Sequence, residues 1–254
     1  MKNLTTYLVA LALAFTLNSC GNKAENLATD SITDYLPLKV GKYITYRLDS
    51  LVFTNFGRNT EIHSYLLKYQ ITDSTTDNLG QKIFIVNEFL RDTASQTPWR
   101  SIGSSYITPL ANHIDWTEDN LRVTKLYLPM RDNFQWKGNI AVPNNPYNNN
   151  YPFSNDDNMQ DWNFYYSGSA KSFAYSNQNY QNVYTIEQRN EILNDPITIP
   201  AAYASKTRAV EHYAKGIGLV HKQFELWEYQ PNTGGSGGGY KVGFGITCWM
   251  IDHN

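Results

Sequence analysis

The sequence predicts an all-β, mostly antiparallel protein whose single curved sheet forms a half-barrel or a partly closed barrel. Aromatic residues make up 14% of the chain and charged residues only 17%, and aromatic and β-branched side chains suit the half-buried surface of a sheet. Short segments of alternating apolar and polar residues recur along the chain, with turn sequences between them, as in antiparallel sheets and barrels. No segment shows helical periodicity over more than about ten residues.

The alternation places each expected strand. In residues 42–48, Ile44, Tyr46 and Leu48 lie on one face of an extended segment. Residues 194–204 are the one place where we consider a short helix. All strands belong to one β domain, predicted at residues 35–254, which is long enough to bury a core without disulfides. Further strands are predicted at residues 61–71, 82–90, 121–128, 162–175, 180–192, 207–213, 218–229 and 240–251.

Two segments between the strands have unusual compositions. Residues 139–161 form one long loop rich in Asn, Pro and Tyr, and a loop of this length inside a compact domain is usually either functional or disordered. Residues 234–239 are glycines and one serine, which we interpret as the tip of a hairpin. This tract is not a phosphate-binding loop, because no strand-then-helix unit surrounds it and no Gly-Lys-Ser/Thr follows.

The N-terminal segment is built like a bacterial export signal. Lys2 supplies a positive start, and residues 7–17 form an apolar run that is shorter than the about 20 residues needed to span a bilayer. A basic start, a short apolar core and a small residue at the cut site are typical of a cleaved signal peptide, here residues 1–19. Residues 20–34 are mostly polar, and we expect a flexible tether there.

Leu17 and Ser19 precede Cys20 in a pattern that resembles the lipobox of bacterial lipoproteins. The resemblance implies that Cys20 carries a thioether-linked lipid and that cleavage takes place just before it. The alternative is an ordinary secretory signal in which the cysteine has no special role. Lipidation of Cys20 would leave Cys248 without an intramolecular partner. Cys248 lies in an apolar run, and we predict a buried, inert thiol.

Two further segments resemble uncharacterised outer-membrane lipoproteins of Bacteroidetes-type bacteria. Residues 35–46 match their Pro-Leu, Val-Gly and aromatic-strand opening, and residues 213–220 match their Tyr-Ala-x-Gly-x-Gly-Leu-Val strand pair. Ile44 departs from the family pattern, in which tryptophan is common. The resemblance implies a lipid anchor in the outer membrane and a half-barrel of the lipoprotein-carrier type around an apolar cavity. Gly216 and Gly218 would allow a tight turn or bulge between two strands.

Aromatic side chains around the long loop and the glycine tract are the candidates for ligand binding. Flat rings cover apolar area at low entropic cost and suit the binding of sugars and peptides. The alternative is that these rings pack the loop onto the sheet. The candidate residues are Tyr147, Tyr151, Trp162, Tyr165 and Trp227.

These features favour a lipid-anchored binding or structural module of the cell envelope. Its ligand would be apolar or a glycan, and an envelope protein is an alternative partner. With 21 basic and 23 acidic residues the net charge is −2, so no basic excess is present for nucleic acid. No catalytic motif is found, and we expect neither an enzyme nor a cofactor. The alternative function is an envelope hydrolase whose acidic residues converge only in the fold.

Metal ligation is considered at two places. Asp156, Asp157 and Asp161 supply oxygen ligands of the kind that calcium prefers, but their spacing does not match an EF-hand and a solvated turn explains the cluster better. His212 and His221 lie on predicted neighbouring strands and could converge, although no close zinc-ligand spacing is present. We therefore expect no metal.

Four Asp-Ser/Thr segments resemble the acceptor motif of the O-glycosylation system of Bacteroidetes-type bacteria. The same residue pairs are also ordinary turn chemistry. The acceptors would be Ser31, Ser50, Ser74 and Thr93.

Replacing the lipidated residue tests the anchor directly. We expect Cys20→Ser to remove acyl labelling and to release the protein from the membrane fraction, because the thioether can form only at the cysteine sulphur. The measurement is metabolic labelling with palmitate followed by membrane fractionation. Cys248→Ser is the control and should keep the label, since its thiol is not at the processing site. A Cys20→Ser protein that stays acylated in the membrane fraction would overturn the lipoprotein interpretation.

Overall fold

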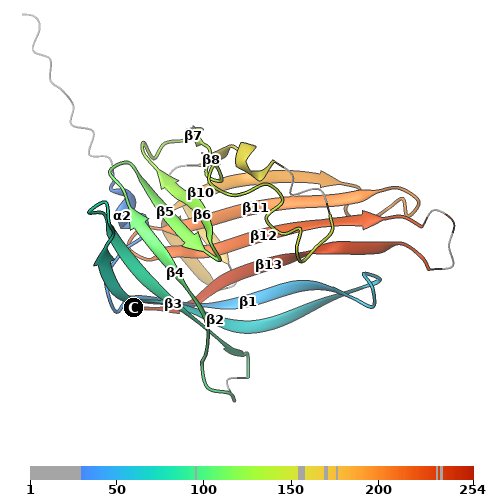
Figure 1. Cartoon of the computed structure of the whole chain (residues 1–254), viewed down its shortest axis with the longest axis horizontal. Helices are drawn as coiled ribbons and strands as arrows, with labels where there is room; N and C mark the ends of the chain where they lie inside the picture. The colour runs from blue at the N-terminus through green and yellow to red at the C-terminus, as the bar shows by residue number, and fades with distance from the viewer. Residues whose placement is uncertain are drawn as a thin grey trace, which may run out of the picture.

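Thirteen antiparallel strands form one sheet in the computed structural model, which describes residues 30–94, 96–153, 158–168, 171–175, 177–232, 234 and 237–254. The order across the sheet is β6-β5-β4-β3-β2-β1-β13-β12-β11-β10-β8-β7, and β9 pairs with β10 off this path (Figure 1). The sheet nearly closes into a barrel, so the predicted all-β, partly closed barrel is confirmed. The strands are β1 (Tyr43–Thr54), β2 (Asn59–Thr76), β3 (Lys82–Asp92), β4 (Arg100–Pro109), β5 (His113–Glu118), β6 (Leu121–Tyr127), β7 (Gln135–Trp136), β8 (Phe164–Tyr166), β9 (Lys171–Tyr175), β10 (Gln178–Leu193), β11 (Ala204–Ala214), β12 (Gly218–Gln230) and β13 (Tyr240–His253).

Most predicted strands match observed strands, and three predictions need correction. Strands β4, β5 and β7 were not predicted, and the expected strand at residues 162–175 is two strands, β8 and β9, with Gly168 at a positive φ between them. Residues 194–204 form no helix. Instead the Asn194 side chain accepts hydrogen bonds from the backbone N–H groups of Thr198 and Ile199, because an Asn side chain can replace a backbone partner in a turn.

Strands β1 and β13 join the two halves of the sheet. Their register pairs Leu48 with Cys248 and Arg47 with Trp249, with an irregularity between Thr45 and Tyr46. On the N-terminal side, β1 to β6 follow one another as consecutive hairpins, and on the C-terminal side β10 to β13 do the same. Figure 1 shows the long strands β10 to β13 continuing into β1 and β2, while β4 to β6 stand across the interior from them.

A single turn of helix begins the described fold. This helix, α2 (Ile32–Tyr35), is capped by Ser31, whose hydroxyl accepts from the backbone N–H of Thr33. Ile32 and Tyr35 lie three positions apart and both are buried in the core. Residues 30–34 therefore belong to the folded domain rather than to the predicted tether, because the side chains of Ile32 and of the adjoining Tyr35 are buried in the core. The remainder of that tether, the signal peptide and Cys20 lie outside the described residues.

Hydrogen bonds link the two ends of the sheet. Trp136 on β7 donates its indole N–H to the carbonyl of Thr124 on β6 at 2.9 Å, and the Thr124 N–H donates to the carbonyl of Gly138 at 2.8 Å. Nearby, the hydroxyl of Tyr166 on β8 donates to the Tyr127 carbonyl and accepts from the Tyr127 N–H. We call this contact between β6 and β7–β8 the seam, and it brings the two edges of the sheet together.

Within the described ranges, no helix has the length and apolar character required to cross a membrane.

The seam leaves no room for a side chain at Gly138. A Cβ atom there would lie 2.3 Å from the ring of the buried Phe164, so we expect Gly138→Ala to lower the free energy of unfolding by about 1–3 kcal/mol. The measurement is urea unfolding followed by tryptophan fluorescence. Gly103→Ala is the control, because its new Cβ would lie 3.6 Å from the nearest atom, an ordinary contact. Equal stabilities of the two variants would contradict the tight packing at the seam.

Candidate functional site: a chamber inside the barrel

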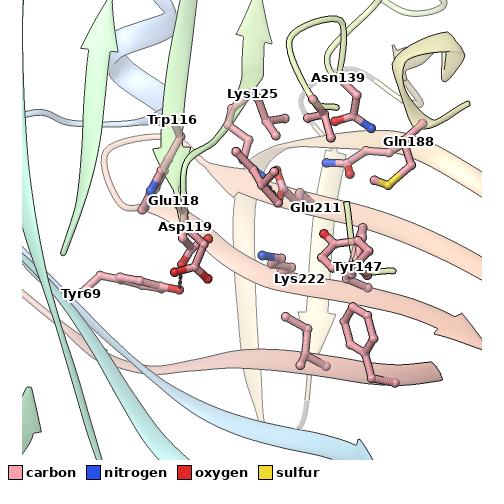
Figure 2. A pocket seen from close by; sticks show the side chains of 17 residues that line it. Tyr69, Trp116, Glu118, Asp119, Lys125, Asn139, Tyr147, Gln188, Glu211 and Lys222 are labelled. Atoms are coloured by element: carbon pink, nitrogen blue, oxygen red, sulfur yellow. Dashed lines mark hydrogen bonds and ion pairs between the residues drawn. The ribbon is translucent and has the colours of Figure 1, made fainter. Parts of the chain in front are cut away.

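The barrel encloses a chamber with two lobes. The loop lobe has a volume of about 250 Å³ and is bounded on one side by Asn139, Val142 and Tyr147 of the long loop. The strand lobe has a volume of about 210 Å³ and lies between β1, β2, β3 and β13. Asp119 lines both lobes and is exposed, so the chamber reaches the surface at the turn between β5 and β6. The lobes share Tyr69, Trp116, Glu118, Asp119, Lys125, Glu211, Lys222 and Ile246 (Figure 2).

Strand periodicity places the lining residues. Alternate side chains of a strand point to the same face, so Lys222 and Phe224 of β12 both face the chamber, as do Phe244 and Ile246 of β13. The residues between them face outward. The alternation is interrupted where the pairing of β11 with β12 shifts register between His212 and Tyr213, so that Leu219 and Lys222 both line the strand lobe.

The long loop forms one wall of the loop lobe. The ring of Tyr147 meets Phe244 edge-on at 5.1 Å and Phe224 at 6.0 Å, and the ring of Tyr151 stacks on Phe244 at 4.9 Å. Val142 of the same loop is buried. In Figure 1 the loop, coloured yellow-green, crosses over the C-terminal strands. Aromatic packing on β12 and β13 therefore holds the loop against the sheet.

A buried ion pair crosses the chamber. The ammonium of Lys125 on β6 lies 2.6 Å from the carboxylate of Glu211 on β11, and the hydroxyl of Tyr213 donates to the same carboxylate at 2.8 Å. Glu211 is only 2% exposed. Burial raises the pKa of Glu211, but the charges of Lys125 and Lys222 outweigh burial and hold that pKa below its ordinary value. Glu211 is therefore ionised and well partnered.

Two further carboxyl groups line the strand lobe. Glu118 accepts a hydrogen bond from the hydroxyl of Tyr69 at 2.7 Å. Glu88 on β3 is buried, and its Oε1 has no hydrogen-bond partner among the described residues. Burial, and then the nearby charge of Glu118, raise the pKa of Glu88 to about 7. Glu88 therefore changes charge near neutral pH, whereas most surface carboxylates do not.

Lys222 lies in the middle of the chamber. Figure 2 shows its side chain rising from β12 between Tyr147 on one side and Glu118 and Asp119 on the other. Across the described part of the chain, its ammonium makes no hydrogen bond or ion pair within 4.0 Å. Burial lowers the pKa of Lys222, but Glu118 and Glu211 more than offset this and raise it above the ordinary value. Lys222 therefore carries its positive charge into the chamber.

The five aromatic candidates do not form one surface. Tyr147 lines the loop lobe, and Tyr151 packs behind it on Phe244. Trp162 is buried against the guanidinium of Arg189, and Tyr165 is a half-buried residue of β8. Trp227 is buried beside the ammonium of Lys241, 4.1 Å from its ring. The five residues therefore lie in different environments, although their position around the long loop and the glycine tract in the sequence suggested a common surface.

The charged lining was missed by the sequence reasoning, although a signal was present. Lys222 stands between Val220 and Phe224 in an alternating strand, and Glu211 stands between Ala209 and Tyr213. A charged residue on the apolar face of a predicted strand points into the core, where it requires a partner. That pattern would have identified both residues.

The described part of the chain brings together no complete set of metal ligands. Asp161 is exposed, and Asp156 and Asp157 lie outside the described residues. Among the described residues no three His, Cys, Asp or Glu side chains come close enough to hold a metal ion. His212 and His221 do converge, with their Nδ1 atoms 3.0 Å apart, but two imidazoles do not complete a zinc ligand set.

Aromatic rings surround this histidine pair. Phe173 of β9 stacks on His212 at 4.0 Å, and Trp249 lies 4.2 Å from His221. Burial and the neighbouring His221 lower the pKa of His212 to about 3, and burial lowers the pKa of His221 to about 4. The pair is therefore neutral at physiological pH and packs as part of the outer layer beneath β9.

The remaining candidates occupy different environments. Ser31 is the N-cap of α2, and Thr93 is exposed in the turn after β3, whereas Ser50 and Ser74 are half-buried within strands. Cys248 is buried, and burial raises the pKa of its thiol to about 12. The predicted burial of Cys248 is confirmed, and its inertness stays a prediction that the raised pKa supports.

Comparison with known proteins finds a distant likeness to solved structures. No protein-family model matches the chain, and no curated protein matches it. The chain is similar to a solved structure from Bacteroides fragilis described as a "putative exported protein with YmcC-like fold", at 11% identity and a TM-score of 0.33. The match covers 86% of this chain and 97% of the other. At this identity and TM-score the likeness carries no functional inference.

Breaking the buried ion pair should destabilise the barrel. We expect Lys125→Met to lower the free energy of unfolding by about 3 kcal/mol, because it leaves the buried carboxylate of Glu211 without its closest cation. Adding Glu211→Gln should recover part of this loss. The measurement is a double-mutant cycle by urea unfolding. Arg47→Met is the control, because its pair with Asp49 is exposed and should contribute about 0–1 kcal/mol. A loss in Lys125→Met no larger than in the control would contradict the proposed importance of the pair.

Titration of Glu88 should make stability depend on pH. Its pKa is about 7 in the folded protein against 4.5 ordinarily, so the folded state holds more protons and the contribution of Glu88 to stability falls as pH rises through this window. We expect wild type to lose stability relative to Glu88→Gln between about pH 5 and pH 8, measured by urea unfolding.

Glu61→Gln is the control for this titration. Glu61 itself pairs with His63, whose imidazole titrates in this window, so a second control, Asp92→Asn, is added. Hydrogen bonds from Thr97 lower the pKa of Asp92, so Asp92 is ionised in both states over this range and the stability difference between wild type and Asp92→Asn should stay constant. A constant difference for Glu88→Gln as well would contradict the raised pKa.

Proposed function

We propose that this protein is a lipid-anchored cell-envelope module that binds a small ligand in the chamber. The observation that carries the proposal is the unfilled interior. The core around it is packed, yet the barrel leaves two lobes of about 250 and 210 Å³ that share part of their lining and open to the surface at Asp119. Together they reach the lower end of ligand pockets, roughly 300–1,000 Å³, so the ligand is small.

The lining supports binding rather than a purely structural role. Aromatic and aliphatic side chains form the walls, and a few polar groups converge between them, as is usual in small-molecule sites. The exposed Asp119 and Ile102 border the chamber, which gives a ligand a way in. The anchoring part of the proposal rests on the signal-like residues 1–19, the lipobox at Cys20 and the polar residues that follow.

An apolar fluorescent probe tests whether the chamber binds ligands. Residues 20–254 carrying Cys20→Ser, which lack the lipid, are titrated with N-phenyl-1-naphthylamine, whose emission rises in an apolar site. We expect saturable binding of the probe to wild type. The affinity should fall at least about tenfold in Ile246→Trp, a loss of about 1.4 kcal/mol, because the indole would occupy space at a residue that lines both lobes.

The matched control for this experiment is Ile62→Trp. Ile62 is exposed on β2 and lines neither lobe, so this variant should bind the probe like wild type. Circular dichroism checks that all three proteins are folded. Absence of saturable binding to wild type, or equal binding by Ile246→Trp, would overturn the proposed binding function.

A second candidate is an envelope hydrolase. The observation that favours it is that Glu88 and Glu118 line the same lobe while burial holds the pKa of Glu88 near 7, since a carboxyl that titrates near neutral pH can act as a general acid or base. Hydrolysis of nitrophenyl ester or glycoside substrates that disappears in both Glu88→Gln and Glu118→Gln would support it. Unchanged hydrolysis in these variants would exclude it.

A further inference from the structure

Several polar side chains around the loop lobe have no hydrogen-bond partner among the described residues. They include Asn139, Gln188 and Lys222, which line this lobe. The indole Nε1 of Trp116 and the Gln188 Nε2 are both buried, and the described residues offer neither a partner. Buried polar groups in proteins are nearly always hydrogen-bonded to protein, water or ligand. The loop lobe is therefore built for an occupant that forms hydrogen bonds.

The unpartnered groups include both donors and acceptors. The Trp116 indole and the Lys222 ammonium can only donate, whereas the amides of Asn139 and Gln188 each donate and accept. In the adjoining strand lobe, Oε1 of Glu88 is a buried atom without a hydrogen-bond partner in the described part of the chain. An occupant that satisfies this set must itself carry donors and acceptors close together, which is the property of hydroxyl groups.

Charges of both signs in the chamber exclude a charged ligand. Glu118, Asp119 and Glu211 face an anion with like charge, and Lys222 at the centre faces a cation with like charge. Lys125 is already paired with Glu211. Lys222 makes no ion pair within 4.0 Å among the described residues, but the nearby charges of Glu118 and Glu211 already offset its own. An anion would therefore meet these carboxylates as well as Lys222 and gain little against its desolvation penalty. A neutral ligand avoids that penalty.

Aromatic rings bound the lobe on two sides. Tyr147, Phe224 and Phe244 pack together on the side of the long loop, while Trp116 and Tyr69 meet edge-on at 5.5 Å on the other side. Figure 2 shows Lys222 between Tyr147 and the side of Trp116 and Tyr69, with Asn139 and Gln188 above Tyr147. Flat ring faces beside hydrogen-bonding groups suit a ligand with apolar C–H faces and polar edges.

We infer that the loop lobe binds one neutral sugar residue. The inference rests on the proposed binding function and assigns the ligand class. The ring of the sugar would lie among the aromatic side chains, with its hydroxyls on Asn139, Gln188, Lys222 and the Trp116 indole. A sugar residue has the required neutral charge, mixed donors and acceptors and apolar ring faces, and one residue suits a lobe of about 250 Å³. Its source is either a monosaccharide in solution or the terminal residue of a glycan.

Saturation-transfer NMR tests this inference on the full processed protein in a polyoxyethylene detergent, which has no sugar head group. The panel contains methyl glycosides of glucose, galactose, mannose and N-acetylglucosamine, with glucuronate, glucosamine and octanoate as charged competitors. We expect at least one neutral glycoside to bind and the charged compounds to bind at least about tenfold more weakly. A disaccharide that ends in the bound sugar distinguishes a glycan terminus, which it mimics, from a monosaccharide in solution.

Variants locate the binding. Gln188→Leu and Lys222→Met should each weaken sugar binding about tenfold, in line with the loss of one strong hydrogen bond. Gln223→Leu is the matched control for Gln188→Leu, because Gln223 lies on β12 but lines neither lobe. If Lys222→Met does not fold, the comparison of Gln188→Leu with Gln223→Leu still tests whether the sugar binds in the loop lobe.

The possible failures are distinguishable. Preferential binding of glucuronate, glucosamine or octanoate would overturn the neutral-sugar inference. Binding of N-phenyl-1-naphthylamine without binding of any sugar would overturn the inference and leave the proposed function intact. If neither probe nor sugar binds, both are overturned, and ordered water then explains the unpartnered polar groups.

Discussion

The structure depends on the pairing of β1 with β13. This pairing joins strands from opposite ends of the described chain, with Leu48 facing Cys248, and it is the link that makes two sets of hairpins into one sheet. Contacts between residues so distant in sequence cost loop-closure entropy before they contribute stability. Without the pairing, β1 and β13 would each present an open sheet edge, and neither half alone would enclose an interior. The chamber is therefore a property of the joined sheet.

Closure of the sheet explains why the interior is partly empty. A sheet of this many strands has a circumference that side chains from the walls cannot fill, so the seam at Trp136 and Gly138 encloses surplus space. The long loop fills part of that space with Tyr147 and Val142. The rest contains charged side chains, which remain there because Glu211 is paired with Lys125 and Glu118 accepts from Tyr69. The fold thus tolerates polar groups that a filled core would exclude.

Periodicity predicted the long strands, but it did not predict the site. Strands β1 to β3 and β10 to β13 alternate over many residues, so their existence follows from sequence alone. Strand β4 contains Gly103 among several serines, and these small residues leave no clear alternation of apolar and polar side chains in the sequence. The chamber could not be predicted, because the approach of Lys125 to Glu211 depends on the curvature and closure of the sheet. Lys222 was detectable in principle, since it lies two positions before the apolar Phe224 on an alternating strand and therefore shares its inward face.

The aromatic residues were interpreted either as a ligand-binding surface or as packing between the long loop and the sheet. At Tyr147 these two roles are compatible. Tyr147 packs the loop onto Phe224 and Phe244, and the same side chain lines the loop lobe. Contacts that hold the loop on the sheet are therefore also contacts that shape the wall of the chamber. A ligand that touches this wall would stabilise the packed loop, because binding to one state shifts the equilibrium toward that state. Loop packing would in turn reduce the entropic cost of binding, since the wall is ordered before the ligand arrives.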